Sequence, residues 1–173
     1  MIPNNFRSPT AVGRCFVLFI ILVISLFIKA TVVHADFFGE DEKVSVIFGQ
    51  YTYHYSPNPE HNPYPWFTAI ELESASRWEL GGALFKNSFS QPCGYLYGGK
   101  RWIVGSANEH FFFKLTGGAL IGYVKPYDKK IPVNADGVGL GVIPAVGYKY
   151  KRASTQFVSL GTAGFMLTLG YDL

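Results

Sequence analysis

Alternation of apolar and polar residues is the feature of this sequence that most limits what it can fold into. Beyond Ala35 every apolar stretch is interrupted by Gly, Tyr, Thr, Lys or Glu. No stretch therefore approaches the roughly 20 apolar residues of a transmembrane helix. No stretch repeats apolar residues at the i, i+3, i+4 spacing of an amphipathic helix either. The period of two instead predicts β-strands along most of the chain.

Turn and loop residues divide the alternating stretches into eight predicted strands. Proline, glycine, asparagine and serine gather between the strands, as in the loop Ser56–Pro65 and the polar stretch Lys125–Asp136. The predicted strands are Lys43–Tyr55, Trp66–Ser74, Arg77–Ser88, Pro92–Val104, Glu109–Tyr123, Gly137–Tyr150, Ser154–Leu160 and Ala163–Leu173. Transmembrane barrels have an even number of strands, and eight is the smallest number known.

The two faces of these strands differ in polarity. The last strand alternates between an apolar set and a set that includes Thr168 and Asp172; the apolar set is Phe165, Leu167, Leu169, Tyr171 and Leu173. In the first strand we expect one face to carry Ile47, Tyr51, Tyr53 and Tyr55, and the other to carry Gln50, Thr52 and His54. A membrane-spanning barrel needs such faces, because one meets lipid and the other the lumen.

Acidic residues on the second and third predicted strands follow the same alternation. Glu71 and Glu73 share one face of their strand, opposite Ile70 and Leu72. Glu79 lies opposite Trp78 in the next strand. The two-residue spacing of Glu71 and Glu73 indicates a polar lumen rather than the carboxylate pair of a glycosidase.

Composition agrees with a barrel in a membrane. The chain is 49% hydrophobic and 17% aromatic but only 16% charged, whereas globular proteins average about 25% charged residues. A soluble eight-stranded barrel of lipocalin type is the alternative, and its outer face would carry charges. The aromatic and aliphatic faces described above carry none. We predict an all-β fold, an eight-stranded antiparallel transmembrane β-barrel that is a monomer in the cell outer membrane.

The N-terminal residues have the organisation of an export signal. Arg7 and Arg14 precede an almost wholly apolar run, residues 16–27, and small residues stand at positions −3 and −1 before Asp36. An uncleaved membrane anchor is the alternative, but the run is too short to span a bilayer. We predict a cleaved signal peptide, residues 1–35, and one barrel domain, residues 36–173. Only Cys93 remains in that domain, so it has no internal disulfide.

A histidine and a serine are expected to meet at one end of the barrel. If both termini are periplasmic, odd-numbered strands run outward, so His54 and the Asn87-Ser88 pair reach the external rim together. An imidazole beside a hydroxyl can take its proton and activate it for acyl transfer. The alternative is that His54 is an ordinary polar rim residue and Ser88 an ordinary turn residue.

Short motifs around these residues resemble a known family. The segment Asn62-Pro63-Tyr64-Pro65-Trp66 follows the histidine-bearing strand, and Phe85-Lys86-Asn87-Ser88 comes one hairpin later. Together they resemble the Asn-x-x-Pro-Trp segment and the Phe-Lys-Asp-Ser motif of the outer-membrane lipid A palmitoyltransferase (PagP) family. The stretch 143–148, Ile-Pro-Ala-Val-Gly-Tyr, is similar to that family's proline-containing sixth strand.

The resemblance implies an enzyme that moves a palmitoyl chain from an outer-membrane phospholipid to lipid A. The family's catalytic histidine and serine fall on His54 and Ser88, and its aspartate falls on Asn87. An amide carries no charge to support an imidazolium, so Asn87 is a departure that bears on the mechanism. The family's N-terminal amphipathic helix has no counterpart either, because residues 36–42 are too few for a stable helix.

Three further residues have both a functional and an ordinary interpretation. Pro144 lacks an amide hydrogen, so it either opens a lateral path for an acyl chain or marks a bend at the start of a strand. Lys129 and Lys130, in a predicted outer loop, could bind lipid A phosphates. Such basic pairs are more often solvated loop residues or interfacial anchors.

Other functions fit the sequence less well or leave the reaction open. A non-enzymatic barrel with a structural or binding role is the main alternative, given Asn87 and the missing helix. A lipid A deacylase would need a serine near a histidine on a late strand, but His110 is followed by three phenylalanines. Glu60-His61 is too small a set of ligands for a metal, and no cofactor is predicted. The net charge of +3 does not indicate nucleic acid.

Overall fold

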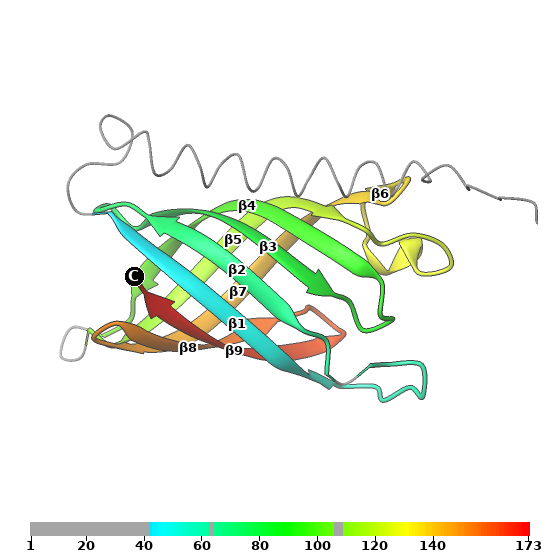
Figure 1. The fold of residues 1–173 in the computed structure, drawn as a ribbon, viewed down its shortest axis with the longest axis horizontal. Helices are drawn as coiled ribbons and strands as arrows, with labels where there is room; N and C mark the ends of the chain where they lie inside the picture. Colours follow the sequence, from blue (N-terminus) through cyan, green and yellow to red (C-terminus); the bar gives the residue numbers. More distant parts are fainter. Residues whose placement is uncertain (1–41, 63, 106–108) are drawn as a thin grey trace, which may run out of the picture.

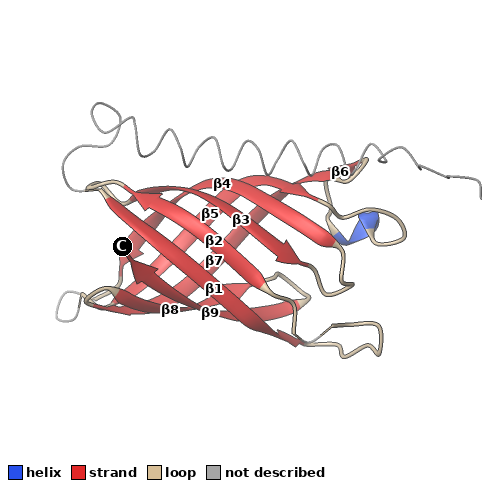
Figure 2. Ribbon diagram, viewed as in Figure 1, coloured by secondary structure: helices blue, strands red, loops and turns tan. Residues whose placement is uncertain are grey.

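The structure, a computed structural model, describes residues 42–62, 64–105 and 109–173. The predicted signal peptide, residues 1–35, lies outside these residues. The strands are β1 Lys43–His54, β2 Phe67–Glu73, β3 Trp78–Lys86, β4 Pro92–Ile103, β5 Phe111–Ile121, β6 Asn134–Ala135, β7 Val138–Tyr150, β8 Ala153–Ser159 and β9 Gly164–Asp172. A single 3-10 turn, Asp128–Lys130, is the only helical element in the described part of the chain (Figure 2). None of the described helical segments is long and apolar enough to cross a membrane.

Eight antiparallel strands close into a barrel. Each strand pairs with the next along the chain, except that β7 follows β5 in the wall. Closure comes from β1, which pairs with both β2 and β9. The short β6 adds only two pairs to the outer edge of β7, so it is not a wall strand. Figure 1 shows the strands wound obliquely around the long axis. All eight predicted strands are present, and the all-β barrel prediction is confirmed.

The two ends of the barrel differ in their connections. Turns 74–77 and 151–152 lie at one end with the C-terminus, whereas the longer loops 55–66 and 122–137 lie at the other (Figure 1). Short turns face the periplasm and long loops face outward in outer-membrane barrels. We call these the inner and outer ends. The loop predicted over residues 125–136 is less irregular than expected, because it holds the 3-10 turn and β6.

The first strand departs from the predicted alternation. Opposite β9, the register passes from Gly49 paired with Thr168 directly to Tyr51 paired with Leu167, so Gln50 forms a β-bulge. A bulge adds one residue and reverses which face the preceding residues occupy. Ile47 therefore lies inside the lumen at 4% exposure, and Gln50 is exposed. The expectation that Ile47 shares a face with the tyrosines, and Gln50 with Thr52, is wrong for this reason.

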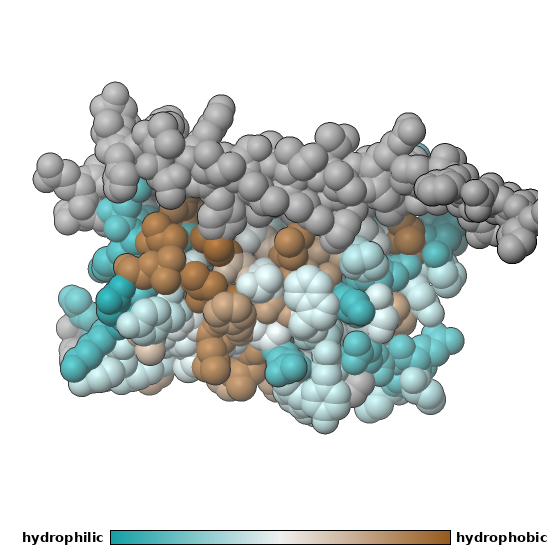
Figure 3. Space-filling view, in the orientation of Figure 1, coloured by the Kyte–Doolittle hydropathy of each residue, from teal (hydrophilic) through white to brown (hydrophobic). Residues whose placement is uncertain are grey.

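The outer wall of the barrel is apolar. Exposed aliphatic and aromatic side chains cover its middle, among them Phe48, Leu115, Val146, Phe157 and Leu169. Exposed aromatic residues mark both ends: Tyr51, Tyr53, Tyr55 and Trp66 at the outer end, and Trp78, Trp102, Tyr150 and Tyr171 at the inner end. Figure 3 shows apolar residues mostly over the middle of the visible wall and hydrophilic ones toward its ends. An apolar band between aromatic girdles is the wall of a membrane-embedded barrel, and such barrels lie in outer membranes.

Charged side chains fill the inner half of the lumen. Glu71, Glu73, Glu79, Arg101 and Lys114 are all buried there. Arg101 pairs with Glu73, and its Nε lies 3.8 Å from Glu79 Oε1. Lys114 Nζ lies 2.5 Å from Glu71 Oε1 and 3.4 Å from Glu79 Oε2. The lumenal positions predicted for Glu71 and Glu73 are confirmed, and the network blocks this half of the barrel.

Removal of one partner from this network should destabilise the barrel. Arg101→Ala leaves Glu73 without its cation in a site that water barely reaches, and a stranded buried charge typically costs about 3–5 kcal/mol. We expect the free energy of unfolding to fall by about that amount, measured by tryptophan fluorescence in urea with the barrel folded into phospholipid vesicles. The neighbouring Lys100→Ala is the control. It removes only an outward contact over the Trp78 ring, at 4.9 Å, and should cost about 1 kcal/mol or less. Equal unfolding of the two variants would contradict the role of the network.

Candidate functional site

His54 and Ser88 meet at the outer end of the lumen. His54 is the last residue of β1, and Ser88 lies in the turn between β3 and β4. Their side chains approach to 2.7 Å between Nε2 and Oγ, and both residues are half-buried. In the tautomer with a free Nε2, the serine hydroxyl donates to the imidazole, which is the geometry needed for proton transfer from the hydroxyl. The expected proximity of these two residues is therefore present.

Backbone hydrogen bonds hold the two loops that surround this pair. Asn62 N donates to Ser88 O at 2.7 Å, which ties the β1–β2 loop to the β3–β4 turn. Lys86 N, at the end of β3, donates to the carbonyl of Trp66, just before β2 begins, at 3.0 Å. Ser88 is thus fixed by the main chain as well as by His54, so its hydroxyl has a defined position at the rim.

Asn87 lies beside Ser88 but its side chain serves the turn. It is only 3% exposed. Its Oδ1 accepts hydrogen bonds from the backbone N–H groups of Phe89 and Gln91, both at 3.0 Å. Its Nδ2 donates to Gln91 Oε1 at 3.0 Å. The side chain of Asn87 is thus committed to the β3–β4 turn, the local bonding that asparagine favours in turns. None of these bonds reaches His54.

His61 is a site residue for which sequence reasoning assigned no role. In the sequence it is only one half of the adjacent pair Glu60-His61, which is too small a set of ligands for a metal. In the structure its ring packs on the His54 ring, with centroids 4.3 Å apart and planes at 32°. Its other neighbour is Phe89, at 5.2 Å and 74°. No spacing rule could have found this contact, because the conformation of the β1–β2 loop decides where His61 points.

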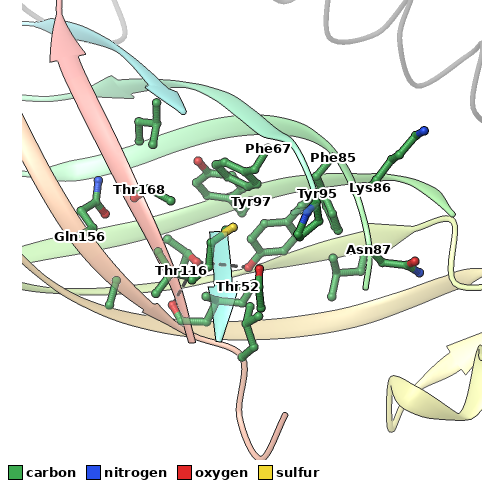
Figure 4. A pocket seen from close by; sticks show the side chains of 18 of the residues that line it. Thr52, Phe67, Phe85, Lys86, Asn87, Tyr95, Tyr97, Thr116, Gln156 and Thr168 are labelled. Atoms are coloured by element: carbon green, nitrogen blue, oxygen red, sulfur yellow. Dashed lines mark hydrogen bonds between the residues drawn. The ribbon is translucent and has the colours of Figure 1, made fainter. Parts of the chain in front are cut away.

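An apolar cavity lies directly beneath the histidine and serine. It occupies the outer half of the lumen and encloses about 100 Å³. Its lining is mostly aromatic and aliphatic: Ile47, Phe67, Phe85, Tyr95, Tyr97, Leu120, Tyr123, Ile143, Val158 and Met166. Figure 4 shows Tyr95 and Tyr97 beside Phe67 and Phe85 in this cavity, with Lys86 pointing away from it. The rings of Tyr95 and Tyr97 stack on each other in this cavity. At its inner end Glu71 and Lys114 join the lining, and Tyr97 OH donates to Glu71 Oε1 at 2.7 Å.

A larger cleft opens above the cavity, among the outer loops. Its volume is about 970 Å³, and both His54 and Ser88 line it. Ser88, Leu120, Tyr123 and Ile143 line the cavity as well as the cleft, so the two adjoin at these residues. The serine hydroxyl therefore lies where an apolar chain buried in the lumen would join a polar group held outside it.

The wall of the barrel is incompletely paired beside this cleft. β8 pairs with β7 only from Ala145 to Tyr150, although β7 begins at Val138. Among the described residues, the facing edge of β7 gains only the two β6 pairs and the bond from Leu140 N to Val133 O.

Pro144 lies where this gap begins. Backbone groups alternate sides along an antiparallel strand. Leu140 N points to the β8 side and Lys149 N to β5, where it donates to His110 O. Pro144 follows Leu140 by four residues, an even number, so its nitrogen also points to the β8 side. Its missing N–H is therefore on the gap side, and the β5–β7 ladder is intact. The residue lies within β7 rather than at its start, contrary to the alternative interpretation.

The basic pair Lys129 and Lys130 lies in the 3-10 turn of the β5–β7 loop, at the outer end. Both side chains are exposed. Lys130 lines the cleft, and its Nζ lies 5.6 Å above the Phe89 ring. Lys129 does not line the cleft. Of the two lysines, Lys130 is therefore the one near the histidine and serine.

Comparisons with known proteins identify no family for this chain. No family model and no curated protein matches it. Among solved structures it is similar to the outer membrane protein Ail of Yersinia pestis in a phospholipid bilayer nanodisc. The two are 14% identical, the match covers 77% of this chain and 100% of Ail, and the TM-score is 0.41. The assignment to outer-membrane β-barrels rests on the closed strand order and the apolar wall of this chain itself.

Proposed function

We propose that this barrel transfers an acyl chain, of the palmitoyl type, from an outer-membrane phospholipid to lipid A. The observation that carries the proposal is the 2.7 Å contact between His54 Nε2 and Ser88 Oγ, at the junction of an apolar cavity and an open cleft. A nucleophilic hydroxyl with its base, a largely apolar cavity for a hydrocarbon chain and an opening for polar head groups are the parts that acyl transfer between lipids requires. The motif resemblance around His54 and Ser88 points the same way.

The chemistry can be written through the histidine and serine alone. Ser88 Oγ attacks the carbonyl carbon of the phospholipid ester while His54 Nε2 takes the hydroxyl proton. The ester bond breaks, His54 returns the proton to the departing glycerol oxygen, and an acyl-serine ester remains. A lipid A hydroxyl then attacks this ester, again giving its proton to His54. Protonation of Ser88 by His54 releases the acylated lipid A and restores the site.

Substrate entry through the wall is supported by the edge of β7. The cleft extends along Leu140 and Val142 on one side and Leu160 on the other, where β7 and β8 do not pair. Leu140 and Val142 also face outward, at 63% and 72% exposure. A lipid in the outer leaflet could thus pass its acyl chain to Ser88 without leaving the membrane. We assign Pro144 to this lateral path, because its missing N–H leaves no donor to close the edge.

Lys130 is the best candidate for binding a phosphate of either lipid. Its ammonium group lies at the rim of the cleft that holds His54 and Ser88. A cation there would orient an anionic head group while the acyl chain occupies the lumen. We assign Lys129, exposed on the same turn, to the approach of lipid A rather than to the cleft itself.

The reaction should be slow for this chain. Loss of the supporting carboxylate from a serine–histidine–aspartate triad lowers kcat about 10⁴-fold. The position that the family resemblance gives to that carboxylate is Asn87, whose side chain is committed to the turn. The same observation favours the second candidate function, a barrel with a structural or binding role and no turnover.

Lipid A from a palmitoylation-deficient host tests the proposal directly. We expect expression of the full chain to add a mass corresponding to one palmitoyl chain to a fraction of the lipid A, measured by mass spectrometry. Ser88→Ala and His54→Ala should each abolish that mass, because each removes one partner of the proton transfer. Lys125→Ala is the matched control, since that side chain is exposed in the same outer loop and does not line the cleft.

The folded state of each variant must be checked before the result is read. Heat-modifiable migration in gel electrophoresis shows whether the barrel is closed. A correctly folded chain that adds no acyl chain would defeat the acyltransferase proposal and leave the non-enzymatic barrel. A phenotype that survives both Ser88→Ala and His54→Ala would do the same.

Restoring the family aspartate should not raise the activity. In Asn87→Asp one carboxylate oxygen would face Gln91 Oε1, whose own amide Nε2 already donates to Val124 O at 3.0 Å. The turn loses a hydrogen bond, and we expect a stability loss of about 1 kcal/mol. We expect acyl transfer at or below the level of the unmodified chain in the lipid A assay. A gain of tenfold or more would show that the carboxylate can reach His54, contrary to the turn geometry described here.

A further inference from the structure

The His54 ring is held by a stack of aromatic side chains from three different loops. His61 packs on His54 at 4.3 Å between centroids, and Phe89 packs edge-on against His61 at 5.2 Å. Tyr127, from the β5–β7 loop, stacks on Phe89 at 3.7 Å with planes at 11°. The stack therefore joins the β1 terminus, the β1–β2 loop, the β3–β4 turn and the β5–β7 loop across the outer end of the lumen.

The backbone fixes His61 in relation to Ser88. The next residue, Asn62, donates its N–H to Ser88 O at 2.7 Å. His61 N itself donates to Asn58 O at 2.9 Å, which closes a turn before it. The ring is half-buried, and its Nδ1 is buried with no hydrogen-bond partner among the described residues. Because Nδ1 makes no hydrogen bond there, packing against His54 and Phe89 is what holds the His61 ring in place.

We propose that His61 is the positioning residue of this site: its ring holds the His54 imidazole in the orientation that keeps Nε2 against Ser88 Oγ. This role rests on the proposed function. Stacked aromatic rings restrict each other's rotation. Contacts between aromatic rings correspond to roughly two- to tenfold in a rate.

Two substitutions at position 61 separate stacking from mere occupancy of the loop. His61→Phe keeps an aromatic face against His54, whereas His61→Ala removes it. Tyr64→Ala is the control, because Tyr64 is in the same loop, is 67% exposed and has its nearest ring contact with Tyr51. The rate of Ser88 modification by a fluorophosphonate probe is the first measurement. Ser88 Oγ bonds to phosphorus, fluoride leaves, and the hydroxyl proton goes to His54.

We expect His61→Phe and Tyr64→Ala to be labelled within about twofold of the unmodified barrel, and His61→Ala to be labelled roughly two- to tenfold more slowly. Labelling of His61→Ala at the unmodified rate would overturn the positioning role. So would labelling of His61→Phe as slow as that of His61→Ala, because a stacking role must be rescued by another aromatic ring.

A second measurement keeps this proposal distinct from the proposed function. If the unmodified barrel is labelled no faster than His54→Ala, the acyl-transfer proposal fails, but the position of the His54 ring can still be measured. Magnetisation transfer between a His54 ring proton and the Ser88 β protons, in barrels isotopically labelled at histidine and folded in micelles, reports that position. Transfer retained in His61→Phe and lost in His61→Ala supports the positioning role. Transfer unchanged in His61→Ala overturns it.

Discussion

Satisfaction of the backbone inside a membrane is the constraint on which the rest of this structure depends. Hydrocarbon offers no partner to an amide or a carbonyl, so a sheet that spans it must pair every strand and close on itself. The pairing of β1 with both β2 and β9 achieves that closure. Closure also divides every strand into an outward face and an inward face, which is why an apolar wall and a charged interior can alternate residue by residue.

The lumen is divided into two chemically different halves. Glu71, Glu79 and Lys114 fill the inner half with ion pairs, whereas the outer half is lined mainly by aromatic and aliphatic side chains. Tyr97 belongs to both, since its ring faces the cavity and its hydroxyl donates to Glu71. An eight-stranded barrel is filled largely by side chains. This division therefore argues against a continuous pore, and the cleft that holds His54 and Ser88 lies at the outer end.

The site lies where the closed sheet is least complete. β7 and β8 stop pairing at Ala145, and the cleft follows the edge that this leaves. Loops rather than strands then supply the contacts around His54: Ser88 from the β3–β4 turn and His61 from the β1–β2 loop. Binding and catalytic side chains are often carried by loops that a rigid scaffold holds in position. Here that arrangement also faces the lipid.

The sequence by itself determined the number of strands, the apolar wall and the meeting of His54 with Ser88. Period-two patterning assigns each residue to a face, and strand order in an up-and-down barrel brings the ends of β1 and β3 to one rim. Only the tertiary structure decided that Gln50 forms a bulge and turns Ile47 inward, that Asn87 bonds within its turn, and that His61 packs on His54. Periodicity is a local property that is repeated in every strand, so a sequence displays it. Bulges and loop conformations depend instead on contacts between residues distant in the chain, which no local pattern records.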